Sequence, residues 1–511
     1  MDSSRAALLK GEETKRELAF VVTTTNETPT ERDRKLIRSH VMKGKNTRKR
    51  IGLDRQQRQI STIALDGRAL REFHQENMNP EGDDGAFGDK APVGATHSVL
   101  LPPPASIFAF VNFTENIDIH ARRMLCTYYT HLKTNMYPIA KYSYSDISNT
   151  YWFHWTQLDL AYLHAVLYTT SFFFDSLAGQ KSERTKYHLY RTVSELNRQL
   201  SNPKTALTDS TTTVVMFMVF IAECFGDIEC AHMHMMGLRK IIDLRGGLSS
   251  YDEKPLLQEK LRRADLIYSM CTGYKPAYSQ NVGSSKCEGS GLAEPIYAES
   301  VDQSCFSRSR HLTRELDRGL HSSFEDVQVL SQLINSSHGS GEKLSDIVVE
   351  GFLTSIQSRL LLLDLHDHPC NPLAEILRLS LHAYLTTVFW NFPGLKTQYP
   401  YLAAQFREAC LIFSPANAGE SFLFAWALMV GAVSLFHGQD QEWLMERLYP
   451  LMENTLGIMW LEVKCSLCQV MWIESLHDGP GMEIFSRYVR ERKGGSAGIT
   501  SANWDAPAMG K

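Results

Sequence analysis

Apolar residues recur at the spacing of an α-helix from about Ser106 onward, and runs of alternating β-branched residues are nearly absent. The segment from Lys186 to Leu200 is one example of an amphipathic pattern. Its apolar stripe consists of Leu189, Val193, Leu196 and Leu200. This pattern predicts an almost entirely helical body.

A second helix is predicted after Asn371-Pro372, where Asn suits the N-cap and Pro suits the first turn. Its apolar stripe consists of Leu373, Leu377, Leu381, Tyr384 and Val388. The segment 391–394, Asn-Phe-Pro-Gly, should end it. The longest apolar stretch, 422–436, spans 15 residues, which is short for a bilayer, so we expect a buried core helix there.

Polar segments mark the expected boundaries of this body. Residues 23–30 and 77–94 are too polar to bury a core, and three consecutive prolines, 102–104, mark the entry into the folded part. We expect a mobile insertion at 273–307, a polar interruption at 335–343 and a frayed tail at 493–511.

These patterns predict an all-α fold, a single large multi-helix domain preceded by a disordered basic N-terminal arm. The predicted organisation is a leader over 1–104 with a basic segment at 31–50, a helical domain over 105–492, and a disordered tail over 493–511. No internal repeat of fixed period is present, so a regular solenoid is not predicted.

Composition narrows the class of protein. The 511 residues carry a net charge of −4, with 43% hydrophobic residues, which excludes wholesale disorder and gives no global polyanion-binding signature. The ten cysteines are scattered, which is typical of a reducing compartment. The first 20 residues contain no apolar segment of the secretory type.

Charge is concentrated in the segment 31–50, where nine cationic residues accompany two acidic ones. Its core consists of Lys43, Lys45, Arg48, Lys49 and Arg50. Three interpretations stay open for it: a nuclear-import signal, a contact to nucleic-acid phosphates, and a solvated arm. Apolar residues at 36–37 and 41–42 interleave with the charges and are compatible with a short docking helix.

The search for catalytic and metal-binding motifs yields two weak metal candidates. Cys230, His232 and His234 carry ligand chemistry, but residues i and i+2 of a helix point about 200° apart, so core or surface histidines are favoured. The segment His366-Asp367-His368 resembles the dyad of helical His-Asp metal phosphohydrolases. A helix-terminal histidine favoured by the backbone dipole is its simpler interpretation.

Cys465 and Cys468 have the spacing of a redox motif, but they lie in an apolar helical stretch, so buried thiols are expected instead. Aromatic residues are dense at 152–155 and 172–174. They fit either a helix core or the wall of an apolar effector pocket, and the sequence does not separate the two. No cofactor, no catalytic residue and no metal ligand set is predicted.

The segment 231–248 resembles the signature helix of the fungal-specific transcription factor domain, the regulatory region of fungal zinc-cluster factors. The matching positions are Gly237, Leu238, Arg245, Gly246 and Gly247. A buried stripe of Ala231, Met235, Leu238 and Ile242 and a left-handed cap at Gly246 are expected.

Two later segments, 263–266 with 275–276 and then 472–478, resemble further landmarks of this family. Segments 20–22 and 37–42 are similar to a leader found on some of its members, a subset that includes proteins labelled "tachykinin family".

The zinc-cluster module of such factors needs six closely spaced cysteines, and the first cysteine here is Cys126. The resemblance therefore implies a nuclear, non-enzymatic transcription regulator that acts through proteins of the transcription machinery, with weak DNA contact through the basic arm as an option and no membrane partner. The alternatives are a metal-dependent hydrolase using His366, Asp367 and His368, and a non-nuclear interaction scaffold. Target genes, effector and oligomeric state are not readable from the sequence.

Overall fold

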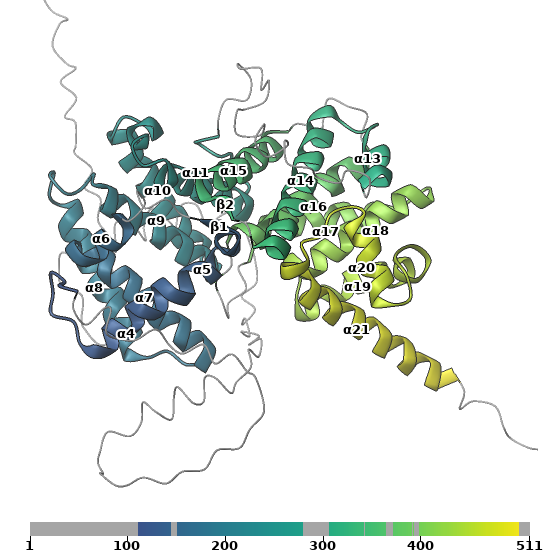
Figure 1. Cartoon of the computed structure of the whole chain (residues 1–511), viewed down its shortest axis with the longest axis horizontal. Helices are drawn as coiled ribbons and strands as arrows, with labels where there is room; N and C mark the ends of the chain where they lie inside the picture. The colour runs from purple at the N-terminus through teal and green to yellow at the C-terminus, as the bar shows by residue number, and fades with distance from the viewer. Residues whose placement is uncertain are drawn as a thin grey trace, which may run out of the picture.

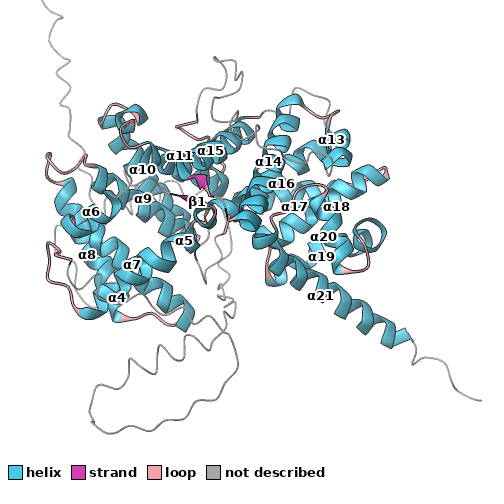
Figure 2. Cartoon of the chain, in the orientation of Figure 1, coloured by secondary structure: helices cyan, strands magenta, loops and turns pink. Residues whose placement is uncertain are grey.

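The structure is a computed structural model that describes residues 111–144, 151–279, 306–341, 343–363, 371–390, 392 and 398–499. The described part of the chain is almost entirely helical (Figure 2), which confirms the all-α prediction. None of the described helices combines the length and apolar character that a membrane-spanning helix requires. The predicted leader, with its basic segment, lies outside the described residues.

The helices form two groups (Figure 1), with α11 and α15 packed against each other between them. The first group is α4 (Ile119–Thr127), the π-helical turn η1 (Tyr128–Leu132), α5 (Lys133–Met136), the 3₁₀ turn η2 (Pro138–Lys141), α6 (Tyr151–Leu158), α7 (Leu160–Ala178), α8 (Glu183–Leu200), α9 (Asp209–Cys224), α10 (Ile228–Leu244), the 3₁₀ turn η4 (Leu248–Tyr251) and α11 (Pro255–Thr272).

The second group follows residue 306 and contains the C-terminal helices. It consists of α13 (Ser307–Thr313), α14 (Arg318–Ser340), α15 (Asp346–Leu362), α16 (Pro372–Phe389), α17 (Pro400–Ile412), α18 (Ala418–Ser434), the 3₁₀ turn η6 (Gly438–Gln441), α19 (Glu442–Leu451), the π-helical turn η7 (Met452–Leu456), α20 (Trp460–Cys468) and α21 (Glu474–Ile499). The buried apolar side chains of both groups form one continuous core.

One short parallel pairing also joins the groups. Strand β1 (Ser143–Tyr144) pairs with β2 (Leu344–Ser345), so that Ser143 lies opposite Leu344. Because β2 leads directly into α15, this pairing fixes the start of α15 beside the first group.

Local sequence explains where several helices begin. Side chains of Asp159, Ser182 and Thr208 each accept a hydrogen bond from a backbone N–H in the first turn of α7, α8 and α9. These bonds satisfy donors that have no partner within the helix. Asn371 does the same for α16 and is followed by Pro372, as predicted.

The predicted apolar stripes hold to different degrees. All five apolar positions predicted for α16 are buried, and the stretch from Phe422 lies buried in α18, as expected. Close packing in α18 needs Gly431, where an added Cβ would lie 2.8 Å from the Phe406 ring. In α8 the prediction is only partly right, because Leu189 and Leu200 are half-buried while His188 is fully buried on the same helix.

Two predictions of irregular structure, at 335–343 and from residue 493, are wrong in part. Residues 335–340 continue α14, because the Asn335 side chain bonds outward, donating to Trp472 O at 2.8 Å and accepting from Glu474 N at 3.1 Å. These tertiary bonds outweigh the weak helix preference of Asn. The tail expected from residue 493 is helical to Ile499, because α21 extends by one backbone hydrogen bond for each residue added. The insertion expected at 273–307 lies mostly outside the described residues.

A buried ion pair lies where α11 meets α15. Arg263 is 0% exposed and pairs with Glu350, which is 4% exposed. The Arg263 guanidinium also lies 4.7 Å from the centre of the Phe389 ring of α16. Lys260 approaches the same carboxylate at 3.9 Å and lies 3.9 Å from the centre of the Tyr137 ring of the first group. Burial lowers the pKa of Arg263 to about 10, so this side chain stays charged at neutral pH.

Removing one charge of this pair should destabilise the protein strongly. We expect Glu350→Gln to lower the free energy of unfolding by about 3–5 kcal/mol, because it leaves the buried Arg263 cation without its counterion. The matched control is Glu183→Gln, which breaks the exposed Lys186–Glu183 pair and should cost less than about 1 kcal/mol. Urea unfolding measures both, and equal costs would contradict the assignment.

Candidate functional site

The candidate site is built around α10, the helix that carries the signature resemblance. Its predicted inward face is confirmed, because Ala231, Met235, Leu238 and Ile242 are all buried. Gly237 is buried on the same helix. These residues pack α10 between α9 and α11.

The end of α10 depends on two glycines. Gly246 has φ of +101° and Gly247 has φ of +93°, which bears out the positive-φ cap expected at Gly246. Their N–H groups donate to Asp243 O at 3.1 Å and to Ile242 O at 2.9 Å. These bonds satisfy carbonyls of the last turn and direct the chain back toward α9.

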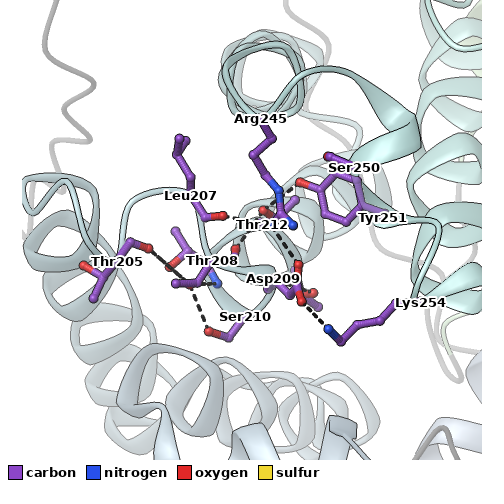
Figure 3. Close-up of polar contacts among 12 residues, drawn as sticks. Thr205, Leu207, Thr208, Asp209, Ser210, Thr212, Arg245, Ser250, Tyr251 and Lys254 are labelled. Carbon is purple, nitrogen blue, oxygen red and sulfur yellow. Dashed lines mark hydrogen bonds and ion pairs between the residues drawn. The ribbon is translucent and has the colours of Figure 1, made fainter.

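Arg245 connects this turn to the start of α9 (Figure 3). Its guanidinium donates to Leu207 O at 2.8 Å, pairs with Asp209 at 2.7 Å, and lies 4.0 Å from the centre of the Tyr251 ring. Lys254 pairs with the other oxygen of Asp209 at 2.6 Å. Asp209 is the first residue of α9, where the helix dipole favours an anion.

The same cluster includes a hydrogen bond between the Tyr251 and Thr212 hydroxyl groups, at 3.1 Å. The charged groups of this cluster therefore contact one another. Asp209 pairs with Arg245 and Lys254, and Arg245 lies on the Tyr251 ring. We therefore interpret the cluster as the device that fixes α10 on α9, with no reactive group left over.

A second polar connection joins α10 to α11. Arg239 contacts Asp265 through two nitrogens, at 3.1 and 2.5 Å, and Asp265 also accepts from Tyr278 N at 2.9 Å. Asp265 belongs to the 263–266 segment that resembles a later landmark. The two segments singled out in the sequence thus bind each other directly in the structure.

The positive φ at Gly247 can be tested with one pair of substitutions. Gly247→Ala should lower the free energy of unfolding by about 1–3 kcal/mol, because an added Cβ meets no neighbour there and the cost is backbone strain alone. The control Gly339→Ala, in α14 and equally open, should raise it by about 0.5–1 kcal/mol. Thermal unfolding distinguishes the two, and a shift of the same sign in both would contradict this role of Gly247.

The sequence profile of the fungal specific transcription factor domain matches residues 124–460. The chain belongs to this family. The matched region runs from α4 to the first residue of α20 and contains α10 and its cap. No curated protein and no solved structure gives a significant match to the chain. The family supports a role in transcription regulation and suggests a non-enzymatic, nuclear protein.

The third segment that resembles the family, 472–478, follows the matched region of the fungal specific transcription factor domain. Its His477 is 1% exposed. The His477 ring accepts a hydrogen bond from Ile473 N at its Nδ1, at 3.1 Å, so its Nε2 carries the proton and donates to Thr387 Oγ1 at 2.8 Å. Burial lowers the pKa of His477 to about 3, and the ring is neutral at neutral pH.

The neutral state of His477 predicts acid sensitivity. Because its pKa is lowered on folding, the ring contributes stability above about pH 6.5, its unfolded value, and loses it progressively down to about pH 3. One proton taken up on unfolding corresponds to about 1.4 kcal/mol for each pH unit in this window. His477→Gln should therefore flatten the pH dependence of the unfolding free energy, measured by urea titration between pH 4 and 7; an unchanged slope would contradict this.

Of the two metal candidates from the sequence, the structure describes the first, at 230–234, and not the second, at 364–370. Within the described residues, no group of three His, Cys, Asp or Glu side chains is arranged to hold a metal ion. His232 instead forms a 2.5 Å hydrogen bond with the Tyr268 hydroxyl. Burial lowers the pKa of His234 to about 4. The segment 364–370, with His366, lies outside the described residues.

Of the redox-spaced cysteines, Cys465 is exposed and Cys468 half-buried, so the expectation of two buried thiols is wrong. The reason is that α20 is a surface helix which turns Val463 and Leu467 inward, and Cys465 lies on its other face. Burial raises the pKa of the Cys468 thiol to about 12, which keeps it protonated.

The structure also brings together a polar cluster that the sequence analysis missed. His164 of α7 and His188 of α8 are buried, with their Nδ1 atoms 3.0 Å apart, and Glu115 lies beside His164 while pairing with Arg191 at 2.6 Å. Burial lowers the pKa of both rings, that of His188 to about 4. The only available signal was a histidine on the inward face of α8, because the partners come from three separate segments.

Proposed function

We propose that this protein is a nuclear regulator of transcription that acts through contacts with other proteins. The family match over residues 124–460 carries this proposal. In this proposal the core of the basic segment, within residues 43–50, is the nuclear-import signal. Weak contact to DNA phosphates is its secondary role.

The outward face of α10 supports the choice of protein contacts. Met233, Met236 and Leu244 are 53%, 51% and 60% exposed, and their spacing places them along one side of the helix. Methionine side chains adapt to varied apolar partners. An exposed apolar stripe on a helix that is fixed from behind by ion pairs is suited to binding another helix.

Nuclear import is tested with a fluorescent fusion of the full chain. Replacing the five cations of the core of the basic segment with Ala (Lys43, Lys45, Arg48, Lys49, Arg50) should abolish nuclear accumulation, because import receptors read clustered charge. The control replaces five exposed cations of the helical body: Lys181, Arg184, Lys186, Arg198 and Lys204. Nuclear accumulation retained by the first variant would remove this role from the segment.

The regulatory role is tested by tethering the chain to a reporter promoter through a foreign DNA-binding domain. We expect the tethered wild-type chain to change reporter transcription. The size of this change should fall by about half or more in the double variant Met233→Lys/Met236→Lys, because two apolar side chains that a partner would bury are lost. The control is Tyr187→Lys/Tyr190→Lys on α8, which alters two similarly exposed side chains. No effect of the tethered wild-type chain would argue against regulation through protein contacts.

A further inference from the structure

Exposed apolar side chains gather where α20 begins against α21, along the edge of the second group (Figure 1). Four large side chains here are between 47% and 68% exposed. We call them the α20–α21 face, and they are Ile458, Met459, Leu461 and Met482. A contiguous group of exposed apolar side chains is typical of a surface that binds another polypeptide.

Trp460 brings the two parts of this face together. Its ring lies 6.0 Å from that of Phe485 in α21. It also lies over Gly481, where an added Cβ would be 2.8 Å from the Trp460 ring, so only glycine leaves room for this contact. Because Met482 directly follows Gly481, the start of α20 and Met482 are neighbours on one surface.

Acidic side chains surround the α20–α21 face. From residue 458 to residue 486 the chain carries four acidic residues and one lysine. The lysine, Lys464, pairs with Glu474 and Asp478, both at 2.7 Å. Glu483, next to Met482, is exposed and has no ion-pair partner among the described residues. The face therefore keeps a net negative charge, which favours a cationic partner.

The apolar stripe on α10 differs from this face in its charge. Lys240 lies within that stripe, one helical turn after Met236 and one turn before Leu244. A cation in the middle of an apolar stripe repels a cationic partner. At the α20–α21 face, by contrast, the single lysine is already held by two carboxylates. A basic segment is therefore expected to prefer the α20–α21 face.

Segment 31–50 of this chain has the complementary chemistry. It lies outside the described residues and carries nine cations and two acidic residues. Its large apolar residues are Leu36, Ile37, Val41 and Met42. In a helix, residues 37 and 41 would lie one turn apart on the same side, with cations on both flanks. Such a segment can cover a small apolar face and contact acidic side chains around it.

The length of the chain permits this contact within one molecule. Residues 51–110 separate the basic segment from Val111, where the described chain begins. These 60 residues can span up to about 200 Å when extended. A tethered segment has an effective concentration that reaches the millimolar range, on the order of 10⁻³ M, so even a weak contact would form within one chain.

We propose that the α20–α21 face binds the basic segment 31–50 of the same chain. The apolar residues of the segment would cover the exposed apolar side chains of the face, and its cations would lie near Glu483 and the carboxylates beside it. Cations held in this way are less accessible to an import receptor or to DNA phosphates. The contact itself does not depend on the import role, because it can be measured on the purified protein.

The test is a fluorescence-anisotropy titration of a labelled synthetic peptide, residues 31–50, with full-length protein. The acceptor is the variant in which the five cations of the core of the basic segment are Ala, so that its own segment competes poorly. We expect saturable binding of one peptide per chain. The wild-type protein should bind the peptide at least severalfold more weakly, because its own segment occupies the face. A peptide whose four apolar residues are Ser should bind roughly tenfold more weakly.

Substitutions in the acceptor locate the contact. Glu483→Lys reverses one charge at the face and should weaken binding severalfold, and Leu461→Ser/Met482→Ser should weaken it roughly tenfold. All three side chains are exposed, so thermal unfolding should stay close to that of the unsubstituted acceptor. The matched controls alter exposed side chains of the first group and should leave the affinity unchanged: Glu253→Lys and Leu158→Ser/Ile119→Ser.

Three results would overturn the proposal. The first is the absence of saturable peptide binding, or equal affinity in the face variants and their controls. The second is equal affinity in the wild type and the five-Ala variant, which would mean that the segment leaves the face open in the full chain. The third is a wild-type dimer in sedimentation that the face variants dissociate, which would identify a second copy of the chain as the occupant.

Discussion

The arrangement of the two helical groups depends on burying a charge pair between α11 and α15. Removing Arg263 and Glu350 from water carries a large desolvation cost, which is offset only when the two charges meet directly. The Lys260 amine, packed on the Tyr137 ring, lies 3.9 Å from the same carboxylate, and burial lowers the pKa of this amine well below its usual value. Phe389 covers the guanidinium. Such a cluster tolerates few alternative arrangements, because any shift of α15 along α11 would leave a buried ion without its counterion. Apolar contacts alone would specify the relative position of these helices less sharply.

Ion pairs also position the signature segment, α10, nearer the surface. Its inner face provides apolar packing, and two ion pairs select one orientation of α10. These pairs are Arg239 with Asp265 and Arg245 with Asp209. On the outward face of α10, Met233, Met236 and Leu244 stay exposed to solvent. The packing and ion pairs of this segment are structural, and they explain its sequence pattern without catalytic chemistry.

Much of the fold follows from short-range rules. The helix beginnings at Asn371 and the inward faces of α10 and α16 were predictable because caps and stripes depend on residues within a few turns. The pairing of Arg263 with Glu350 was not, because its two halves lie on separate helices and each alone resembles a surface charge. The helical state of Asn335 depends likewise on the distant Trp472. For the candidate site, the sequence located the signature helix and the cap at Gly246, whereas the partner of Arg245 requires the tertiary arrangement.

The parallel pairing of β1 with β2 bears on how the protein can be divided. Ser143 belongs to the first group and Leu344 to the second, and the chain between them includes the whole of α6 to α14. A fragment that stops after α11 would retain β1 without its neighbouring strand and Arg263 without Glu350, while one that starts at α13 would retain β2 without β1 and Glu350 without Arg263. Dissection of this protein into halves is therefore expected to yield pieces that fold poorly by themselves and recombine when they are expressed together.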